Sequence, residues 1–284
     1  MTDKDVILLS AAGNDEPTIR VSGRHDADAF VEIGSVTKTF TAALLHVLAE
    51  EGRVGLDDRV SDYVEIEGEP QITLRHLAEH TSGLPRLPPG VHVWRSDPYK
   101  RIDQSKFAEI LHGLPRFVRG EPGRDVAYSN FGYGLLGAAL ASASGLSWIE
   151  AIQSYVVKPL DLDERVVTKD NVPKDRRLVA VDRKGRPRDT WTLGPLEPAG
   201  GLWTTPRALA DYTCKVLIDR VFGAIPIGWR ATDGVDWHNG ATRDAAVFVG
   251  ARSDTGRWAV CHGLRQPAVE IDAFGLLSLE EKQV

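Results

Sequence analysis

The strand-like segments of this chain gather at its two ends, and this placement limits the possible folds more than any other feature. Short apolar runs at residues 6–9, 19–22 and 30–33 alternate with turn residues near the N-terminus. Two further runs, at residues 247–249 and 258–261, lie near the other end. This order predicts an α+β fold, in which one sheet is assembled from both chain ends and helices are inserted between them.

The strongest helical pattern lies at residues 35–52, with the sequence SVTKTFTAALLHVLAEEG. Its apolar residues recur at helical spacing, and Gly52 suits the position after a helix end. The same reasoning predicts helices at residues 74–80, 132–145, 147–160 and 208–217. Residues 161–195 are charged and contain several prolines, so we expect a loop or lid there. We expect the chain to end in a polar tail.

Composition limits the class of protein. The chain has 284 residues, which is enough for a full core, and we expect a single domain over residues 1–284. We expect a sheet lobe from about residues 1–60 and 200–284, and a helical lobe from about residues 61–199. The formal net charge of −6 argues against a nucleic-acid partner. Cys214 and Cys261 form no CxxC pair, so both should be reduced and packed.

The first residues, MTDKDVILLSAAG, do not have the pattern of an export signal. Acidic residues flank the lysine, and the apolar run stops at Ser10. No stretch approaches the roughly 20 apolar residues that a membrane-spanning helix needs. We therefore expect a cytoplasmic protein without a membrane partner, and its oligomeric state is not constrained.

Ser35 and Lys38 are the first candidates for chemistry. They stand three residues apart at the start of the helix predicted at 35–52, so both side chains project from one face. A serine hydroxyl is a poor nucleophile until a base takes its proton. A lysine in a dry pocket, or beside another cation, has a lowered pKa and can be that base. The S-x-x-K spacing alone fits a helix-capping serine beside a solvated lysine equally well.

Two more short motifs add groups that such a site needs. The sequence Y-S-N at residues 128–130 follows a Pro-Gly turn and precedes a helix, which places Tyr128 on a loop. A tyrosine can act as a general base where nearby cations lower its pKa. The sequence H-N-G-A at residues 238–241 opens a predicted strand. Glycine there lets the backbone approach a ligand, and a strand N–H can bind an oxyanion.

These motifs, in this order, resemble the signature of the serine β-lactamase and penicillin-binding-protein superfamily, in its class C and esterase-like branch. That signature is S-x-x-K, then Y-x-N, then K/H-x-G. The stretches EIGSVTKTFTA, ITLRHLAEHTSGLP and PAGGLWTTPRALADY also look like the family. The resemblance covers most of residues 30–250. It implies a β-lactamase/transpeptidase-like fold, with an antiparallel sheet, flanking helices and a mainly helical lobe.

The resemblance implies acyl transfer through a covalent acyl-enzyme. In this scheme Ser35 attacks a carbonyl group, and Lys38 and Tyr128 act together as the base that takes its proton. Asn130 orients the substrate and Lys38. The oxyanion rests on the backbone N–H groups of Ser35 and Ala241.

The resemblance also implies a substrate-binding strand around residue 240. His238 stands where β-lactamases usually have lysine, and a largely neutral imidazole favours an esterase, amidase or acyltransferase. Gly240 lets this strand approach the ligand. Arg243 is a candidate partner for a substrate carboxylate, although a surface salt bridge explains it equally well. We expect Trp237 to line the site. Three other aromatic residues are expected to shape the pocket: Trp94, Tyr99 and Phe117.

Two other motifs are better explained as structure. The H-x-x-E-H spacing at residues 76–80 matches a zinc-binding helix, but a zinc site needs a third ligand. The G-x-G-x-x-G run at residues 132–137 lacks the preceding strand of a dinucleotide-binding unit, and its glycines fit close helix packing instead. We therefore predict no metal and no organic cofactor.

Together these observations predict a serine hydrolase or acyltransferase that acts on a small ester or amide. Hydrolysis and transfer differ only in whether water or a second nucleophilic substrate meets the acyl-enzyme. Two alternatives stay open. One is a β-lactamase, or a D-alanyl carboxypeptidase or aminopeptidase. The other is a binding scaffold that kept the fold and lost turnover.

Overall fold

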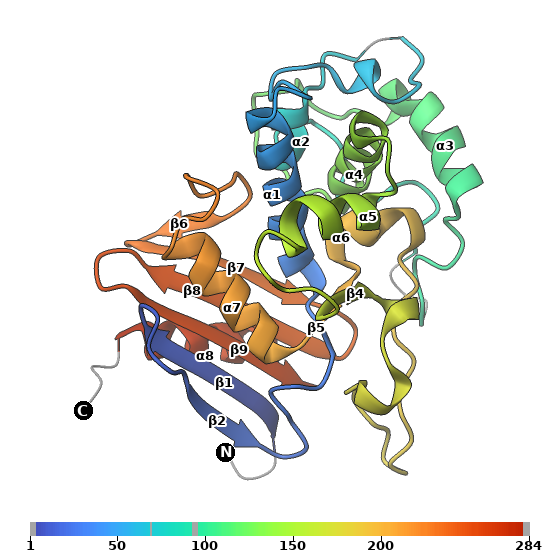
Figure 1. The fold of residues 1–284 in the computed structure, drawn as a ribbon. Helices are drawn as coiled ribbons and strands as arrows, with labels where there is room; N and C mark the ends of the chain where they lie inside the picture. Colours follow the sequence, from blue (N-terminus) through green and yellow to red (C-terminus); the bar gives the residue numbers. More distant parts are fainter. Residues whose placement is uncertain (1–3, 69, 93–95, 281–284) are drawn as a thin grey trace.

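A six-stranded antiparallel sheet joins the two ends of the chain in the computed structural model, which describes residues 4–68, 70–92 and 96–280 (Figure 1). The strand order is β2-β1-β9-β8-β7-β6. β1 pairs with β9 along its whole length, from Asp5 opposite Leu264 to Ala12 opposite Arg257. The strands are β1 (Asp5–Ala12), β2 (Thr18–Ser22), β6 (Arg230–Thr232), β7 (Val235–Ala241), β8 (Ala245–Arg252) and β9 (Arg257–Leu264). The predicted α+β class is confirmed.

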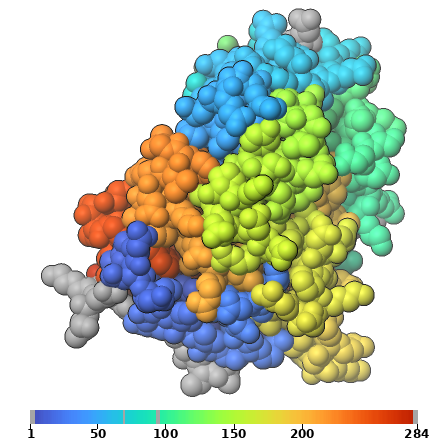
Figure 2. Space-filling model, in the orientation of Figure 1, coloured from blue at the N-terminus to red at the C-terminus, as the bar shows by residue number. Residues whose placement is uncertain are grey.

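The sheet separates two apolar cores because successive side chains of a strand point to opposite faces. Ile7 and Leu9 of β1 belong to the main core, whereas Val6 and Leu8 belong to a smaller core. Helix α7 (Pro206–Leu217) covers the main-core face, and α8 (Ala268–Glu280) covers the other (Figure 1). Figure 2 shows the N-terminal strands packed beside the C-terminal part of the chain.

Helix α8 corrects the expectation of a polar C-terminal tail. Its residues Ile271 and Leu279 are buried against the sheet, but Val269 is 73% exposed and Leu277 is 58% exposed. Apolar residues therefore lie on both the covered and the open side of α8. This distribution removes the one-sided pattern by which a surface helix is recognised.

The remaining helices pack around α1 (Thr37–Glu50), which follows a single 3-10 turn at Gly34–Val36. α1 contacts α4 (Asn130–Ser144), α5 (Trp148–Ile152) and α6 (Glu197–Gly200). A Cβ atom at Gly137 of α4 would lie 2.1 Å from Pro198 Cγ, so glycine is needed where α6 meets α4. Two glycines of the G-x-G-x-x-G run, Gly134 and Gly137, thus serve close packing. The proposed lobe boundaries remain a prediction.

Smaller elements complete the fold. Ser147 caps α5 by accepting a hydrogen bond from the Glu150 N–H, and a π-helical turn at Gln153–Val157 continues that helix. A second, three-stranded sheet has the order β3-β5-β4. Its strands, and the helices not yet introduced, are β3 (Val31–Glu32), β4 (Val166–Thr168), β5 (Leu202–Thr204), α2 (Leu74–Ala78) and α3 (Gln104–His112).

The cysteine prediction is confirmed, because Cys214 and Cys261 are both free and buried. In the part of the chain that the structure describes, no single helix is long and apolar enough to cross a bilayer. α4 and the helical segment Trp148–Val157 satisfy the length and composition criteria only as a pair, bent by 73° at the break between them.

Candidate active site

Ser35 lies in the 3-10 turn that leads into α1, and its hydroxyl is held by side chains rather than by the helix end. Neither this turn nor α1 has a side-chain N-cap, so the capping interpretation of Ser35 is wrong. Its Oγ lies 3.3 Å from Nζ of Lys38 and 2.6 Å from the hydroxyl of Tyr128. The structure therefore brings together Ser35, Lys38 and Tyr128, although Ser35 and Tyr128 are 93 positions apart in the sequence.

Lys38 is completely buried in the interior of the protein. Its Nζ donates hydrogen bonds to Oδ1 of Asn130 at 2.8 Å and to the carbonyl oxygen of Ala199 at 2.5 Å. Burial, and secondarily the charge of Arg86, hold the pKa of Lys38 well below its usual value of 10.5. Both effects favour the neutral amine over the ammonium ion.

Tyr128 behaves differently from the expectation that cations lower its pKa. Burial raises the pKa of its hydroxyl and outweighs the opposing effects of the Ser35 hydrogen bond and the Arg86 charge. The guanidinium of Arg86 lies 5.0 Å from the Tyr128 ring, and the His80 ring lies 4.5 Å away. The phenol is therefore protonated at neutral pH, which makes it a donor toward Ser35 rather than a base.

Asn130 is positioned by the start of α4. Ser129 caps this helix by accepting a hydrogen bond from the Gly132 N–H, and the Ser129 N–H donates to Nδ1 of His80 at 3.1 Å. The Asn130 N–H donates to the carbonyl oxygen of Arg86 at 2.9 Å. These backbone bonds fix the first turn of α4, from which the Asn130 amide reaches Lys38.

The edge of β7 lies directly against the Ser35 turn. A Cβ atom at Gly240 would lie 2.2 Å from the carbonyl oxygen of Ile33 and 2.9 Å from the backbone nitrogen of Ser35. Only glycine permits this approach, which brings Ser35 and Ala241 to the wall of one small cavity of about 30 Å³. The residues lining it are Gly34, Ser35, Tyr99, Asn130, Trp191, Leu193, Leu196, Ala199, Gly200, Ala241 and Thr242.

His238 of β7 is neutral near pH 7. It is only 2% exposed, and burial lowers the pKa of its imidazole to about 3. Its Nδ1 lies 2.7 Å from the carbonyl oxygen of Asn239, a distance at which the Nδ1–H tautomer donates a hydrogen bond. At this position the site therefore offers an uncharged imidazole.

The structure does not bring Trp237 and Arg243 to the Ser35 cavity. Trp237 neighbours His238 on β7 and thus points to the opposite face of the sheet, where its ring stacks on Phe248. Arg243 lies 3.7 Å from the Asp244 carboxylate and lines a separate cavity beside the first.

Of the aromatic residues expected to shape the pocket, Tyr99 lines the cavity, and Phe117 packs at the edge of the main core. Trp94 lies outside the described residues. Three groups at the site were missed: the side chains of Arg86 and His80, and the carbonyl of Ala199. A main-chain acceptor carries no side-chain signal, and the contacts of Arg86 and His80 depend on tertiary packing.

The two histidines of the H-x-x-E-H motif have structural roles. His76 Nδ1 accepts the N–H of Thr73 in a capping box, and His80 accepts the N–H of Ser129. Among the residues that the structure describes, no group of three His, Cys, Asp or Glu side chains is placed to hold a metal ion.

Comparison with known proteins identifies the class. Residues 3–251 match the model of the beta-lactamase family, so the chain belongs to this family of serine hydrolases. The D-alanyl-D-alanine-carboxypeptidase/endopeptidase AmpH of Escherichia coli K12 is 33% identical over 198 residues, which are 64% of this chain and 48% of that protein. The chain thus matches about half the length of this curated relative.

Solved structures show the same fold at lower identity. A class C beta-lactamase from Rhodobacter sphaeroides superposes with a TM-score of 0.79 at 19% identity, covering 97% of this chain and 93% of the other. A D-stereospecific amidohydrolase from Streptomyces gives a TM-score of 0.74 at 21% identity, with coverages of 93% and 90%. The predicted β-lactamase/transpeptidase-like fold is confirmed.

Proposed function

We propose that this protein is a serine hydrolase or acyltransferase that forms an acyl-enzyme on Ser35 from a small ester or amide. The observation that carries the proposal is the buried amine of Lys38, 3.3 Å from the Ser35 hydroxyl and with a lowered pKa. A neutral amine is a base, and an adjacent base is what a serine hydroxyl needs to become a nucleophile.

The hydrogen bonds of Lys38 support this role. A neutral amine has two N–H donors and one lone pair. The two donors are directed to Asn130 and Ala199, which leaves the lone pair for the Ser35 hydroxyl proton. Asn130 and Ala199 therefore orient the base, and Lys38 receives the proton as the bond between Ser35 Oγ and the carbonyl carbon forms.

The other groups act on the tetrahedral intermediate. Its oxyanion is bound by the backbone N–H groups of Ser35 and Ala241, and removing one such donor typically costs about 10²–10³ in rate. Tyr128, protonated and 2.6 Å from Ser35 Oγ, is placed to give a proton to the leaving group as the bond to the carbonyl carbon breaks. The proton that Lys38 took from Ser35 then restores the Tyr128 phenol. Water or a second nucleophilic substrate then attacks the acyl carbonyl and gives its proton to Lys38. That proton returns to Ser35 Oγ as its bond to the acyl carbon breaks.

Intact-protein mass spectrometry after exposure to a fluorophosphonate probe tests the nucleophile. We expect one adduct on the wild type and none on Ser35→Ala. Esters and amides can then be screened with and without an added amine or alcohol. Only free acid in both cases identifies a hydrolase, whereas a new ester or amide identifies transfer. No adduct on either protein would favour the inactive scaffold.

A D-alanyl peptidase is the second candidate, because the E. coli relative is named as a D-alanyl-D-alanine carboxypeptidase/endopeptidase. The neutral His238 argues for a substrate that needs no cation at that position. Release of D-alanine from a D-alanyl-D-alanine peptide, faster than hydrolysis of simple esters, would favour the peptidase. Rapid opening of a chromogenic cephalosporin would favour a β-lactamase.

A further inference from the structure

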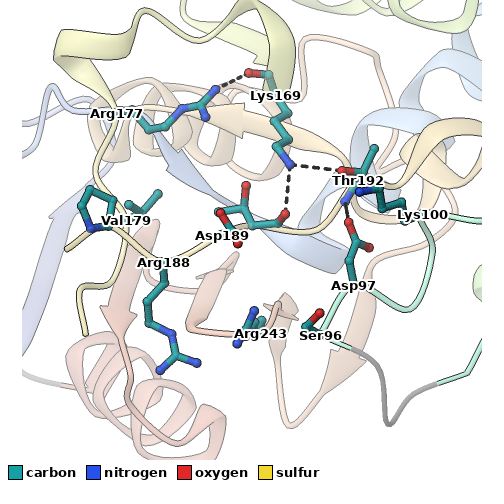
Figure 3. Close-up of a pocket in the computed structure, with 12 residues that line it drawn as sticks. Ser96, Asp97, Lys100, Lys169, Arg177, Val179, Arg188, Asp189, Thr192 and Arg243 are labelled. Carbon is teal, nitrogen blue, oxygen red and sulfur yellow. Dashed lines mark hydrogen bonds between the residues drawn. The ribbon is translucent and has the colours of Figure 1, made fainter. Parts of the chain in front are cut away.

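A second cavity, of about 510 Å³, lies beside the Ser35 cavity and is rich in positive charge (Figure 3). Among its lining residues, five are basic and two are acidic. This excess is local, because the whole chain has a formal net charge of −6. The charged residues that line it are Lys100, Lys169, Arg177, Arg188, Arg243, Asp97 and Asp189.

Three chain segments connect this basic cavity to the reactive serine. Tyr99, Trp191 and Thr242 line the Ser35 cavity, and the residues that follow them in sequence line the basic cavity. These following residues are Lys100, Thr192 and Arg243. Because neighbouring residues of the same segments form both walls, the two cavities adjoin each other.

The basic cavity is held in shape by its own contacts. Nζ of Lys169 donates to the carbonyl oxygens of Thr190 and Trp191 and to the Thr192 hydroxyl, at 2.9, 3.3 and 3.2 Å. These bonds fix the loop at residues 190–192, which contributes residues to both cavities; Figure 3 shows the bond from Lys169 to Thr192. Oδ2 of Asp97 accepts a hydrogen bond from the Thr192 N–H at 2.9 Å. This bond joins the segment that contains Asp97 to the same loop.

The other charges fall into two groups. Asp244 does not line the cavity, but its carboxylate lies 2.8 Å from Arg188 and 3.7 Å from Arg243. One carboxylate therefore forms ion pairs with two guanidinium groups. Lys100 and Arg243 are both exposed, and each directly follows a residue that lines the Ser35 cavity. They are therefore the cations best placed to meet a ligand that extends from the serine.

We propose that the basic cavity is a specificity subsite for an anionic group, a carboxylate or a phosphate, at the far end of the substrate's acyl part. The inference rests on the proposed function, because it assumes that Ser35 is acylated. Tyr128, assigned to protonate the leaving group, borders neither cavity. The part of the substrate that enters the two cavities is thus the acyl part, whose charge Lys100 and Arg243 bind.

Matched chromogenic esters test this subsite. The 4-nitrophenyl monoester of adipate is compared with 4-nitrophenyl hexanoate, and a third ester carries a terminal phosphate. Shorter and longer dicarboxylates vary the reach. We expect kcat/KM to be roughly tenfold higher for an anionic ester than for its neutral partner, the size of one charge-assisted hydrogen bond. Comparing the carboxylate and phosphate esters identifies which anion the cavity takes.

Charge reversal provides the decisive variant. Arg243→Glu should remove the preference for the anionic ester and create one for an ester with a terminal ammonium group. Arg116→Glu, at an exposed residue that lines neither cavity, is the matched control and should keep the wild-type ratio. Because the readout is a ratio of two substrates on one protein sample, a misfolded fraction cancels.

The outcomes separate the subsite from the chemistry. Cleavage of the neutral ester that disappears in Ser35→Ala, with no preference for the anionic esters, overturns the subsite and leaves the proposed function standing. Equal changes of the ratio in both charge-reversal variants also overturn it. If no ester is cleaved, calorimetric titration of Ser35→Ala with the uncleaved esters decides: tighter binding of an anionic ester supports the subsite, and equal binding refutes it.

Discussion

Replacing Lys38 with methionine should change how the stability of the protein depends on pH. Lys38 is fully buried, and its pKa in the folded protein is held well below 10.5, mainly by burial. Between the folded and unfolded pKa values, the unfolded lysine therefore binds a proton that the folded one lacks. Stability then increases with pH across this window. Methionine at this position has no titrating amine, and its apolar side chain is of similar length to that of lysine.

The magnitude follows from this one proton. If Lys38 is the base at neutral pH, it is uncharged at pH 7 in the fold and charged when unfolded. The free energy of unfolding then increases by about 1.4 kcal/mol per pH unit from this residue alone, or about 2.7 kcal/mol from pH 7 to pH 9. All other titrating groups are shared by the two proteins and cancel in the difference.

Urea unfolding at pH 7, 8 and 9 measures this difference. The quantity compared is the free energy of unfolding of the wild type minus that of Lys38→Met. We expect this difference to increase by about 2.7 kcal/mol from pH 7 to pH 9. Lys184→Met, at an exposed turn residue, should follow the wild type. If Lys38→Met and the wild type show parallel pH dependences, Lys38 is charged in the fold, and the assignment of the base is wrong.

Three other results are expected. Lys38→Ala and Tyr128→Phe should each lose most of kcat/KM, and the double variant should lose little more, because the proton that Lys38 takes from Ser35 is the one that restores Tyr128; a loss equal to the product of the single losses would contradict this. Activity should fall as the pH drops, because Lys38 then gains a proton. His238→Asn should leave this acidic limb of the pH profile unchanged, because the pKa of the His238 imidazole is about 3. A shift of the limb in this variant would show that the imidazole titrates there. Gly137→Ala should lower the free energy of unfolding by about 1–3 kcal/mol in a urea titration, because its Cβ would lie 2.1 Å from Pro198 Cγ; unchanged stability would mean that α6 shifts freely.

Local periodicity was sufficient to predict the elements that carry a one-sided pattern. Ser35 and Lys38 meet because residues three apart share a helix face, and their atoms lie 3.3 Å apart. α8 was missed because Val269 and Leu277 are exposed while Ile271 is buried, so its apolar residues mark no single face. The sequence predicts a helix well when only one of its faces is buried and apolar. When apolar residues lie on both sides, as in α8, the helix is recognised only in the packed structure.

The electrostatics of the site depended on contacts that sequence neighbours do not reveal. Cations near Tyr128 were expected to lower its pKa, and Arg86 does lie over its ring, yet burial outweighs it and raises the pKa. The extent of burial is set by segments far away in the chain. The carbonyl of Ala199, which orients Lys38 from 161 residues away, is a main-chain group available to any residue type.

The pairing of β1 with β9 also determines when the candidate active site can form during synthesis. β1 needs β9 as its partner, with Val6 opposite Gly263, and Gly240 of β7 forms the wall beside Ser35. The ribosome therefore releases Ser35, the proposed nucleophile, before the strands that complete its surroundings. Such long-range pairing is slow to form, so the candidate site is complete only after β7 and β9 have been made.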